Sequence, residues 1–218
     1  MLVGAVVCPH PPLLVPELAA GAAHELAALR AACDEAVGRL LRANPTEVAV
    51  VGRASLDGRL VSTSGSFAGF GVPLTVGEGD PALPLPHTVG CWLLDRAGWS
   101  GRRTYYGATD GEQPTIADED RLALLVMGDA SARRSERAPG YLDPRAEDFD
   151  ATVVAALRSG PAAVAALDGR LASELMAAGW PAWQVLARTT AGQQWSCEVS
   201  YDEAPYGVGY VVASWLPL

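Results

Sequence analysis

One histidine stands in a proline-rich segment, CPHPP (8–12), directly after an apolar run. Proline fixes its own backbone and restricts the residue before it, so Cys8 and His10 are held extended. An imidazole presented on a stiff loop is suited to metal ligation or to proton transfer. His10 is therefore the first candidate for chemistry, and a purely structural role in a proline-rich turn is the alternative.

A second polar group, GDASARR (128–134), follows another apolar run. Asp129 is placed to orient a histidine or a bound water, and Ser131 is placed to form a hydrogen bond with a ligand. Arg133 and Arg134 are candidates for binding a carboxylate or for a solvated surface. A turn in which Asp129 bonds to the local backbone is the structural alternative.

The third candidate is EVSYDEAPYGVGY (198–210), near the end of the sequence. Asp202 and Glu203 supply carboxylates that are suited to bind a metal ion, and a solvated turn is the alternative. Gly207 and Gly209 allow a tight turn or a close approach of the backbone to a neighbour. The segment is not a dinucleotide fingerprint, because the third glycine is missing and a strand is predicted to follow.

Two further histidines complete the set. His24 lies inside a helical pattern, where a surface or packing role is expected. His87 precedes a predicted helix and, with Thr88 as a candidate cap, is placed to point into a cleft and handle protons. A three-histidine zinc site would need all three, which their contexts do not favour. The sequence contains no G-x-S-x-G elbow, P-loop or H-E-x-x-H motif.

These candidates need elements that bring them together. Apolar runs at 2–8, 47–52 and 122–127 predict buried strands, and apolar residues at helical spacing predict a helix over 16–43. Strand, helix and strand in this order indicate a parallel sheet with helices packed on it. Ligands bind at the carboxyl ends of the strands in such sheets, which is where the CPHPP and GDASARR segments are expected.

The remaining pattern predicts one α/β domain over residues 1–218, with a mostly parallel central sheet flanked by helices. Residues 53–80 are rich in Gly and Ser, hold Phe67 and Phe70, and predict a long, partly ordered excursion. Further helices are expected at 88–97, 146–158 and 161–178, the last broken near Asp168 and Gly169. Further strands are expected at 104–107, 183–189, 196–201 and 207–215.

Composition limits the classes of function. Half of the 218 residues are apolar, which is enough for a sizeable core. Acids outnumber bases 25 to 16, and the net charge of −9 argues against a nucleic acid partner. No stretch reaches the roughly 20 apolar residues of a membrane helix, and the start lacks the positive region of a signal peptide. A cytoplasmic protein with reduced thiols is therefore expected, because the four cysteines are widely scattered.

Taken in order, an apolar strand, CPHPPLL, a long helix, GDASARR…APGYLDPRAEDFD and a terminal EAPYGVGYVVASW resemble the class III extradiol ring-cleavage dioxygenase superfamily. This superfamily includes the catalytic subunit of protocatechuate 4,5-dioxygenase and the MEMO proteins. The resemblance spans nearly the whole chain and is to a short bacterial branch. In the active enzymes, a catechol binds a non-haem Fe(II) held by two histidines and one carboxylate.

The resemblance implies that His10 matches the first metal-ligand histidine and that the carboxylate ligand is Glu203 or Glu198. The second ligand histidine of the superfamily lies in the loop after the second strand. Here that stretch reads VVGRASLDGRLVSTSGSFAGFG (50–71) and contains no histidine. Ala132 stands where the acid–base histidine falls in a motif that resembles G-D-x-S-H. His87 resembles a histidine that precedes a helix in MEMO-like relatives.

The first functional hypothesis is a metal-dependent, oxygenase-like enzyme that acts on a small aromatic or carbonyl substrate. His10 and Glu203 would hold the Fe(II), and Asp57, Cys8 or a water would replace the missing histidine. Asp129, Ser131 or His87 would handle protons.

The second hypothesis is a catalytically inactive homologue that serves as a ligand-binding protein or as the partner subunit of a homo- or hetero-oligomer. The missing second histidine and Ala132 favour it, since loss of an acid–base group alone costs about 10²–10⁴ in rate. A third reading is that the proline-rich loop only shapes the fold and the cleft is vestigial.

Overall fold

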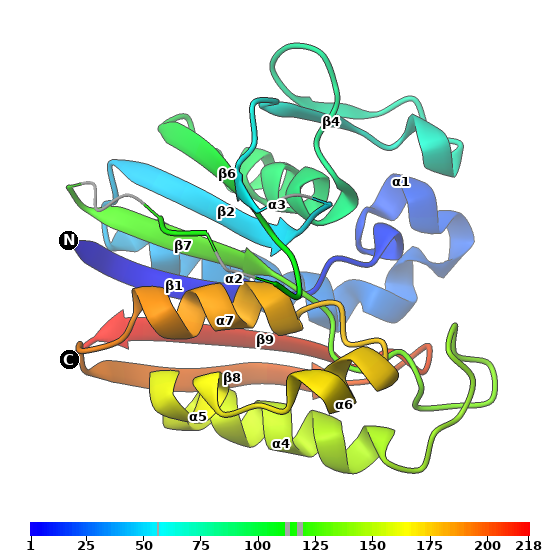
Figure 1. Ribbon diagram of the computed structural model, residues 1–218. Helices are drawn as coiled ribbons and strands as arrows, with labels where there is room; N and C mark the ends of the chain where they lie inside the picture. The colour runs from blue at the N-terminus through cyan, green and yellow to red at the C-terminus, as the bar shows by residue number, and fades with distance from the viewer. Residues whose placement is uncertain (56, 112–113, 117–119) are drawn as a thin grey trace.

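The computed structural model describes residues 1–55, 57–111, 114–116 and 120–218. Its main feature is a seven-stranded sheet in the order β3-β6-β2-β7-β1-β9-β8 (Figure 1). The four central strands run parallel: β6 (Arg102–Ala108), β2 (Glu47–Arg53), β7 (Leu122–Met127) and β1 (Leu2–Cys8). Antiparallel strands complete the two edges: β3 (Gly58–Arg59) beside β6, then β9 (Tyr210–Pro217) and β8 (Trp195–Glu203) beside β1. The predicted mixed α/β class with a mostly parallel central sheet is confirmed.

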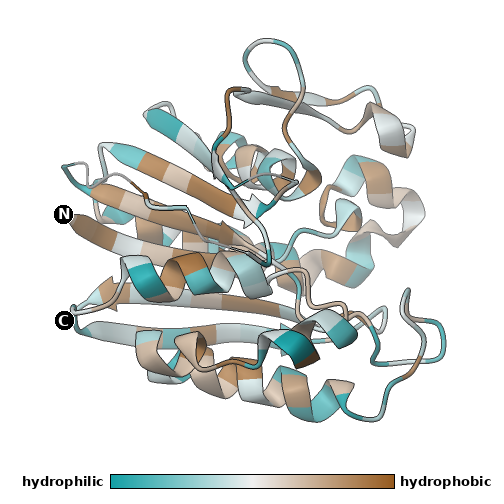
Figure 2. Ribbon diagram, in the orientation of Figure 1, coloured by the Kyte–Doolittle hydropathy of each residue, from teal (hydrophilic) through white to brown (hydrophobic). Residues whose placement is uncertain are grey.

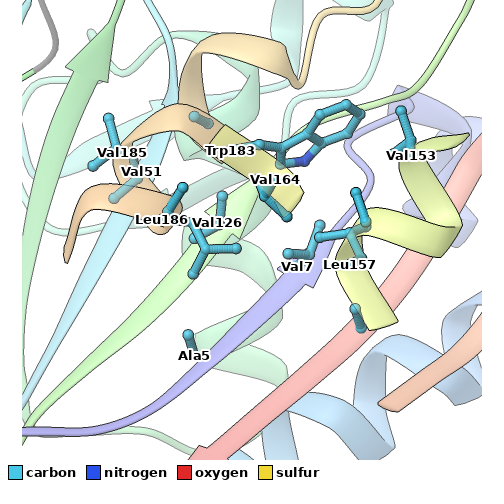
Figure 3. Close-up of a cluster of buried hydrophobic side chains, with 14 of the residues drawn as sticks. Ala5, Val7, Val51, Val126, Val153, Leu157, Val164, Trp183, Val185 and Leu186 are labelled. Carbon is cyan, nitrogen blue, oxygen red and sulfur yellow. The ribbon is translucent and has the colours of Figure 1, made fainter. Parts of the chain in front are cut away.

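The central strands are buried on both faces, as expected for a parallel sheet that is covered by helices. Along β1, Ala5 and Val7 pack into one hydrophobic cluster, whereas Val6 and Cys8 pack into the other. Figure 2 shows apolar residues running along these strands. Figure 3 shows part of the first cluster, in which side chains of the sheet meet Leu157, Val164 and Trp183 from the covering helices.

Helices cover each face of the sheet. The first cluster contains residues of α4 (Ala146–Ser159), α5 (Pro161–Ala165), α6 (Gly169–Glu174) and α7 (Trp180–Thr189). The second contains residues of α2 (Ala27–Arg42) and α3 (Leu85–Arg96). Among the residues that the structure describes, no helix is long and apolar enough to cross a membrane.

The single helix predicted over 16–43 is wrong in its first half. The chain forms the short helix α1 (Pro16–Ala19), the 3-10 helix η2 (Ala20–Leu26) and only then α2. Ala20 has a positive φ of 45°, which interrupts the helical path. Between Ala19 and Glu25 the sequence offers only Ala, Gly and His, so no large apolar side chain anchors a regular helical face to the core.

The strand predicted at 183–189 is also wrong, because this segment belongs to helix α7. Trp183 and Leu186 are fully buried at helical spacing, and Arg188 is exposed. A short apolar run is compatible with either element. Pro181 in the first turn was the available sign of a helix start, because proline is favoured there.

Other predicted elements are confirmed with shifted ends. Helix α3 starts at Leu85, so His87 and Thr88 lie inside its first turns, and the expected Thr88 cap is wrong because Pro84 holds that position. The break expected near residues 168–169 exists, since the Asp168 side chain accepts hydrogen bonds from the backbone N–H groups of Arg170 and Leu171. The last strand starts at Tyr210 in place of residue 207.

The excursion predicted over 53–80 carries short elements of its own. After β3 it forms β4 (Ser64–Ser66), the 3-10 turn η3 (Ala68–Phe70) and β5 (Thr75–Gly77), and β4 pairs with β5 outside the main sheet. The two phenylalanines differ in environment. Phe67 is completely buried in the second cluster, whereas half of Phe70 is exposed.

Two backbones cross at Gly128, just after β7, and this contact fixes the start of α7 against the end of the sheet. A methyl group added to Gly128 would lie 2.2 Å from the Cα of Gly179. We therefore expect Gly128→Ala to lower the free energy of unfolding by about 2 kcal/mol or more, measured by urea titration. Gly21→Ala is the matched control. Nothing lies within 4 Å of a methyl group there, so its stability should be unchanged or slightly raised.

Candidate functional site

The carboxyl ends of three parallel strands form one edge, and the pairing aligns Cys8 of β1, Met127 of β7 and Gly52 of β2 in a row. His10 and Asp129 each follow this row by two residues. His87 of α3 lies over the same row, since a methyl group added to Gly52 would be 3.3 Å from its Cε1. The structure therefore brings these three predicted residues to one edge of the sheet.

His10 and Asp129 are in direct contact. The backbone N–H of His10 donates a hydrogen bond of 2.8 Å to Oδ1 of Asp129. The ring Nδ1 of His10 lies 3.4 Å from the same oxygen, which is longer than a good hydrogen bond but within the range of an ion pair. Because an ionised carboxylate can accept hydrogen bonds but cannot donate them, Asp129 favours the tautomer of His10 that carries its proton on Nδ1.

The other ring nitrogen of His10 is left available. The residue is only 8% exposed, and its buried Nδ1 makes no hydrogen bond among the described residues, with the Asp129 carboxylate 3.4 Å away. In the described part of the chain Nε2 makes no hydrogen bond, and it is the ring nitrogen that reaches the surface. A histidine whose Nδ1 faces a carboxylate and whose Nε2 is free has the arrangement of a general acid–base group.

Tyr210, the first residue of β9, is a site residue that sequence reasoning missed. It is 4% exposed, and burial raises the pKa of its hydroxyl, helped by the nearby charge of Asp129. Within the described residues its hydroxyl makes no hydrogen bond. The tyrosine lies in the EVSYDEAPYGVGY segment, but nothing in the sequence shows that the charge of Asp129, some 80 residues away, acts on its hydroxyl.

His87 is more deeply buried than the sequence predicted, which placed it in a cleft. It is completely buried, and its Nε2 donates a hydrogen bond of 2.9 Å to the carbonyl oxygen of Tyr106. Burial lowers the pKa of His87 from 6.5 to about 4, the hydrogen bond to Tyr106 opposes this shift, and the charge of His10 adds to it. His87 is therefore neutral at pH 7. It lies beneath the surface of the site, where it bonds to the backbone of β6.

Ser131 binds a buried carboxylate of the protein. Both its backbone N–H and its hydroxyl donate to Asp150 of α4, at 2.8 and 2.9 Å, and Arg134 donates a third bond of 3.2 Å. Burial raises the pKa of Asp150, and the three hydrogen bonds oppose that shift. Ser131 and Arg134 therefore fix the loop that carries Asp129, and Asp150 is a second residue that sequence reasoning missed.

Two of the predicted motifs meet through their backbones. Ala130 N–H donates to the carbonyl of Gly209, and Gly209 N–H donates to the carbonyl of Ser131, each at 2.8 Å. Glycine is required at 209, because a methyl group there would lie 2.5 Å from Oδ2 of Asp150. The GDASARR loop and the terminal glycine segment thus form one unit, which brings the start of β9, with Tyr210, next to the loop that carries Asp129.

The structure does not bring the predicted carboxylate ligands to His10. Glu203 is exposed at the end of β8, where it accepts a 3.2 Å hydrogen bond from the Tyr201 hydroxyl. Glu198 lies in the middle of β8 and pairs with Arg39 of α2. Strand β9 lies between β8 and β1. Asp202 is exposed at the same end as Glu203.

The residues proposed to replace the missing histidine make other contacts and do not lie beside His10. Asp57 accepts hydrogen bonds of 2.7 Å from both the backbone and the hydroxyl of Thr109. Cys8 is completely buried beside Cys33. Across the described ranges, no three His, Cys, Asp or Glu side chains are grouped so that they could hold a metal ion. The donor set around His10 therefore does not fit the two-histidine, one-carboxylate iron site.

Comparison with known proteins adds no family to this description. No protein-family model matches the chain, and no curated protein matches it.

The loop that carries Asp129 should depend on the charge of Asp150. In Asp150→Asn, the amide keeps one acceptor oxygen for three donors, so we expect a loss of about 3 kcal/mol in the free energy of unfolding, measured with urea. Asp202→Asn, an exposed aspartate on β8, is the control and should change stability little. Equal stability of the two variants would show that the buried hydrogen bonds contribute nothing.

His87 should make the fold sensitive to acid. Its folded pKa of about 4 lies below the unfolded value of 6.5, so the unfolded chain binds more protons between these values. Stability that is present above pH 6.5 is lost as the pH falls towards 4, by at most about 3 kcal/mol. In His87→Gln this component should disappear, and in His24→Gln it should remain. The measurement is the free energy of unfolding of each variant across this pH range.

Proposed function

We propose that residues 1–218 form one domain of the class III extradiol dioxygenase type, in which His10 transfers a proton to or from a small oxygen-bearing ligand. The observation that carries this proposal is the contact between His10 and Asp129 at the carboxyl ends of β1 and β7. Asp129 holds the backbone of His10 through its N–H and lies 3.4 Å from Nδ1 of the ring, which is the side of the imidazole that the carboxylate takes in histidine-based acid–base catalysis.

The direction of proton transfer follows from the proposed tautomer of His10, in which Nδ1 carries the proton and Nε2 is free. Neutral His10 accepts a proton at Nε2 from an acidic C–H or O–H of the ligand, and the carboxylate of Asp129 stabilises the imidazolium that forms. The Tyr210 hydroxyl is protonated at neutral pH, like an ordinary tyrosine, and we assign it the role of donating a hydrogen bond to the ligand oxygen that gains charge. A carbonyl compound with acidic α protons, or a phenol, offers both groups.

Iron-dependent ring cleavage is not the activity that these residues support best. Of the ligands that the resemblance implies, only His10 lies at the proposed site, and its Nδ1 is already turned towards Asp129. Glu203 is bound by Tyr201, and the loop after β2 supplies no histidine. We therefore place no step of the reaction on Fe(II).

The exposure of His10 bears on the kind of ligand. His10 is only 8% exposed, so a ligand that reaches its Nε2 must present a small group there. The hypothesis of an inactive partner subunit stays a prediction, and a partner that covers this edge would enclose the site.

Proton transfer can be tested without knowing the natural ligand. The protein is incubated in D₂O with acetone, dihydroxyacetone, pyruvate and 2-hydroxyacetophenone, and exchange of the α protons is followed by NMR. We expect faster exchange with the wild-type protein for at least one probe, a loss of about 10²–10⁴ in His10→Gln, and a smaller loss in Tyr210→Phe. His24→Gln is the control and should exchange at the wild-type rate.

A measurement of bound Fe(II) distinguishes this proposal from the metalloenzyme hypothesis. After anaerobic loading with Fe(II), bound metal per chain should be no higher in the wild-type protein than in His10→Ala. Near one equivalent in the wild type, lost in His10→Ala, would overturn the proposal in favour of a rebuilt iron site. Exchange that is no faster with the wild type than with His10→Gln for every probe would also overturn it.

A further inference from the structure

Three exposed apolar side chains lie together on the loop between β7 and α4 and just after α6 (Figure 1). Tyr141, Leu142 and Met176 are 61%, 45% and 51% exposed. The sulfur of Met176 lies over Gly140, since a methyl group added to that glycine would be 2.7 Å from it. We call these three side chains the apolar patch. Single exposed apolar residues are normal, whereas a contiguous group of them is typical of an interaction surface.

Two residues of the apolar patch have an unfavourable backbone conformation. Tyr141 and Met176 both lie in the left-handed region, with φ of 59° and 58°. Met176 follows the end of α6, where Ala177 N–H closes the helix by a 2.8 Å hydrogen bond to the carbonyl of Ala172, and glycine or asparagine is favoured at this position. A bulky side chain there costs free energy. Strain at two positions that also expose large apolar side chains points to a contact made outside the chain.

An apolar hollow of about 380 Å³ adjoins the patch, between the start of α4 and α6. Its lining includes Phe149, Leu167 and Leu171. Arg145, which also lines it, forms an ion pair of 2.8 Å with Glu174, two residues before Met176. The same surface therefore carries both a projecting tyrosine and a hollow. An aromatic side chain held in such a hollow is typical of the centre of a protein interface.

The charges around the patch are arranged so that two copies can pair. Arg145 is neutralised by Asp143 and Glu174, each at 2.8 Å. Glu136 and Arg137 are exposed neighbours in the turn before the patch, and neither forms an ion pair within the described part of the chain. Around a two-fold axis, Glu136 of each copy can pair with Arg137 of the other. Two chains of net charge −9 repel one another, so they approach most easily through a face without excess negative charge.

We propose that the apolar patch is the centre of a two-fold interface between two copies of this chain. Tyr141 of each copy enters the hollow of the other, and reciprocal Glu136–Arg137 pairs flank this contact. A second copy fits better than a different protein, because one surface carries both halves of each contact. His10 and Asp129 are not part of the patch, so this proposal stands or fails separately from the proton transfer proposed above.

The test measures the mass of the full chain by sedimentation equilibrium between about 1 and 200 µM. We expect the wild type to change from one chain to two within this range. Tyr141→Asn and Met176→Asn remove an apolar side chain and supply a residue that tolerates the left-handed conformation. Each should raise the dissociation constant of the dimer by at least about tenfold, while Tm at the lowest concentration is unchanged or higher. Val61→Asn, at an exposed valine outside the patch, is the control and should associate as the wild type does.

Exchange of charge tests the two-fold arrangement. Glu136→Arg and Arg137→Glu each place like charges together across the axis, and should weaken association by about threefold or more at low salt. The variant that carries both changes restores opposite charges and should associate as the wild type does. The proposal is overturned if the wild type has the mass of one chain over the whole range, if Tyr141→Asn associates unchanged, or if the double variant is as weak as the single ones.

Discussion

The candidate site depends on one buried carboxylate, that of Asp150. It gathers three donors from the loop after β7, two from Ser131 and one from Arg134. Removing such a charge from water is costly, so it persists only because every donor is in place. The loop that is fixed in this way carries Asp129, and Asp129 in turn orients His10. The geometry of the site therefore depends on the buried hydrogen bonds between Asp150 and the loop, which do not involve His10 itself.

The proline-rich loop and the aspartate loop contribute in different ways. The prolines restrict the backbone around His10, and the hydrogen bond from its N–H to Asp129 joins the end of β1 to the end of β7. The terminal glycine segment is hydrogen-bonded to this loop at Ala130 and Ser131, which brings Tyr210 near enough for the charge of Asp129 to act on its hydroxyl. Three segments that are far apart in the sequence thus meet around one carboxylate, and our proposal of proton transfer in place of iron binding is based on this arrangement.

Local pattern was enough to predict the central strands β1, β2 and β7, and the parallel order then placed His10 and Asp129 at one edge. It was not enough for α7, where a short apolar run fits helix and strand equally. Nor does any local signal show that Asp150 pairs with Ser131, that the charge of Asp129 acts on Tyr210, or that Glu203 accepts a hydrogen bond from Tyr201. These contacts are decided by side-chain packing and by desolvation of charge, which depend on the assembled sheet.

The central claim is that Asp129 sets the tautomer of His10 and leaves Nε2 free to exchange a proton. The most direct test is a two-dimensional ¹H–¹⁵N spectrum of the imidazole rings, recorded at a pH where histidines are neutral and assigned with His10→Gln. The account predicts that Nδ1 of His10 is protonated and Nε2 is not, and that this preference weakens in Asp129→Asn. A His10 ring protonated on Nε2, or a tautomer that does not respond to Asp129→Asn, would contradict it.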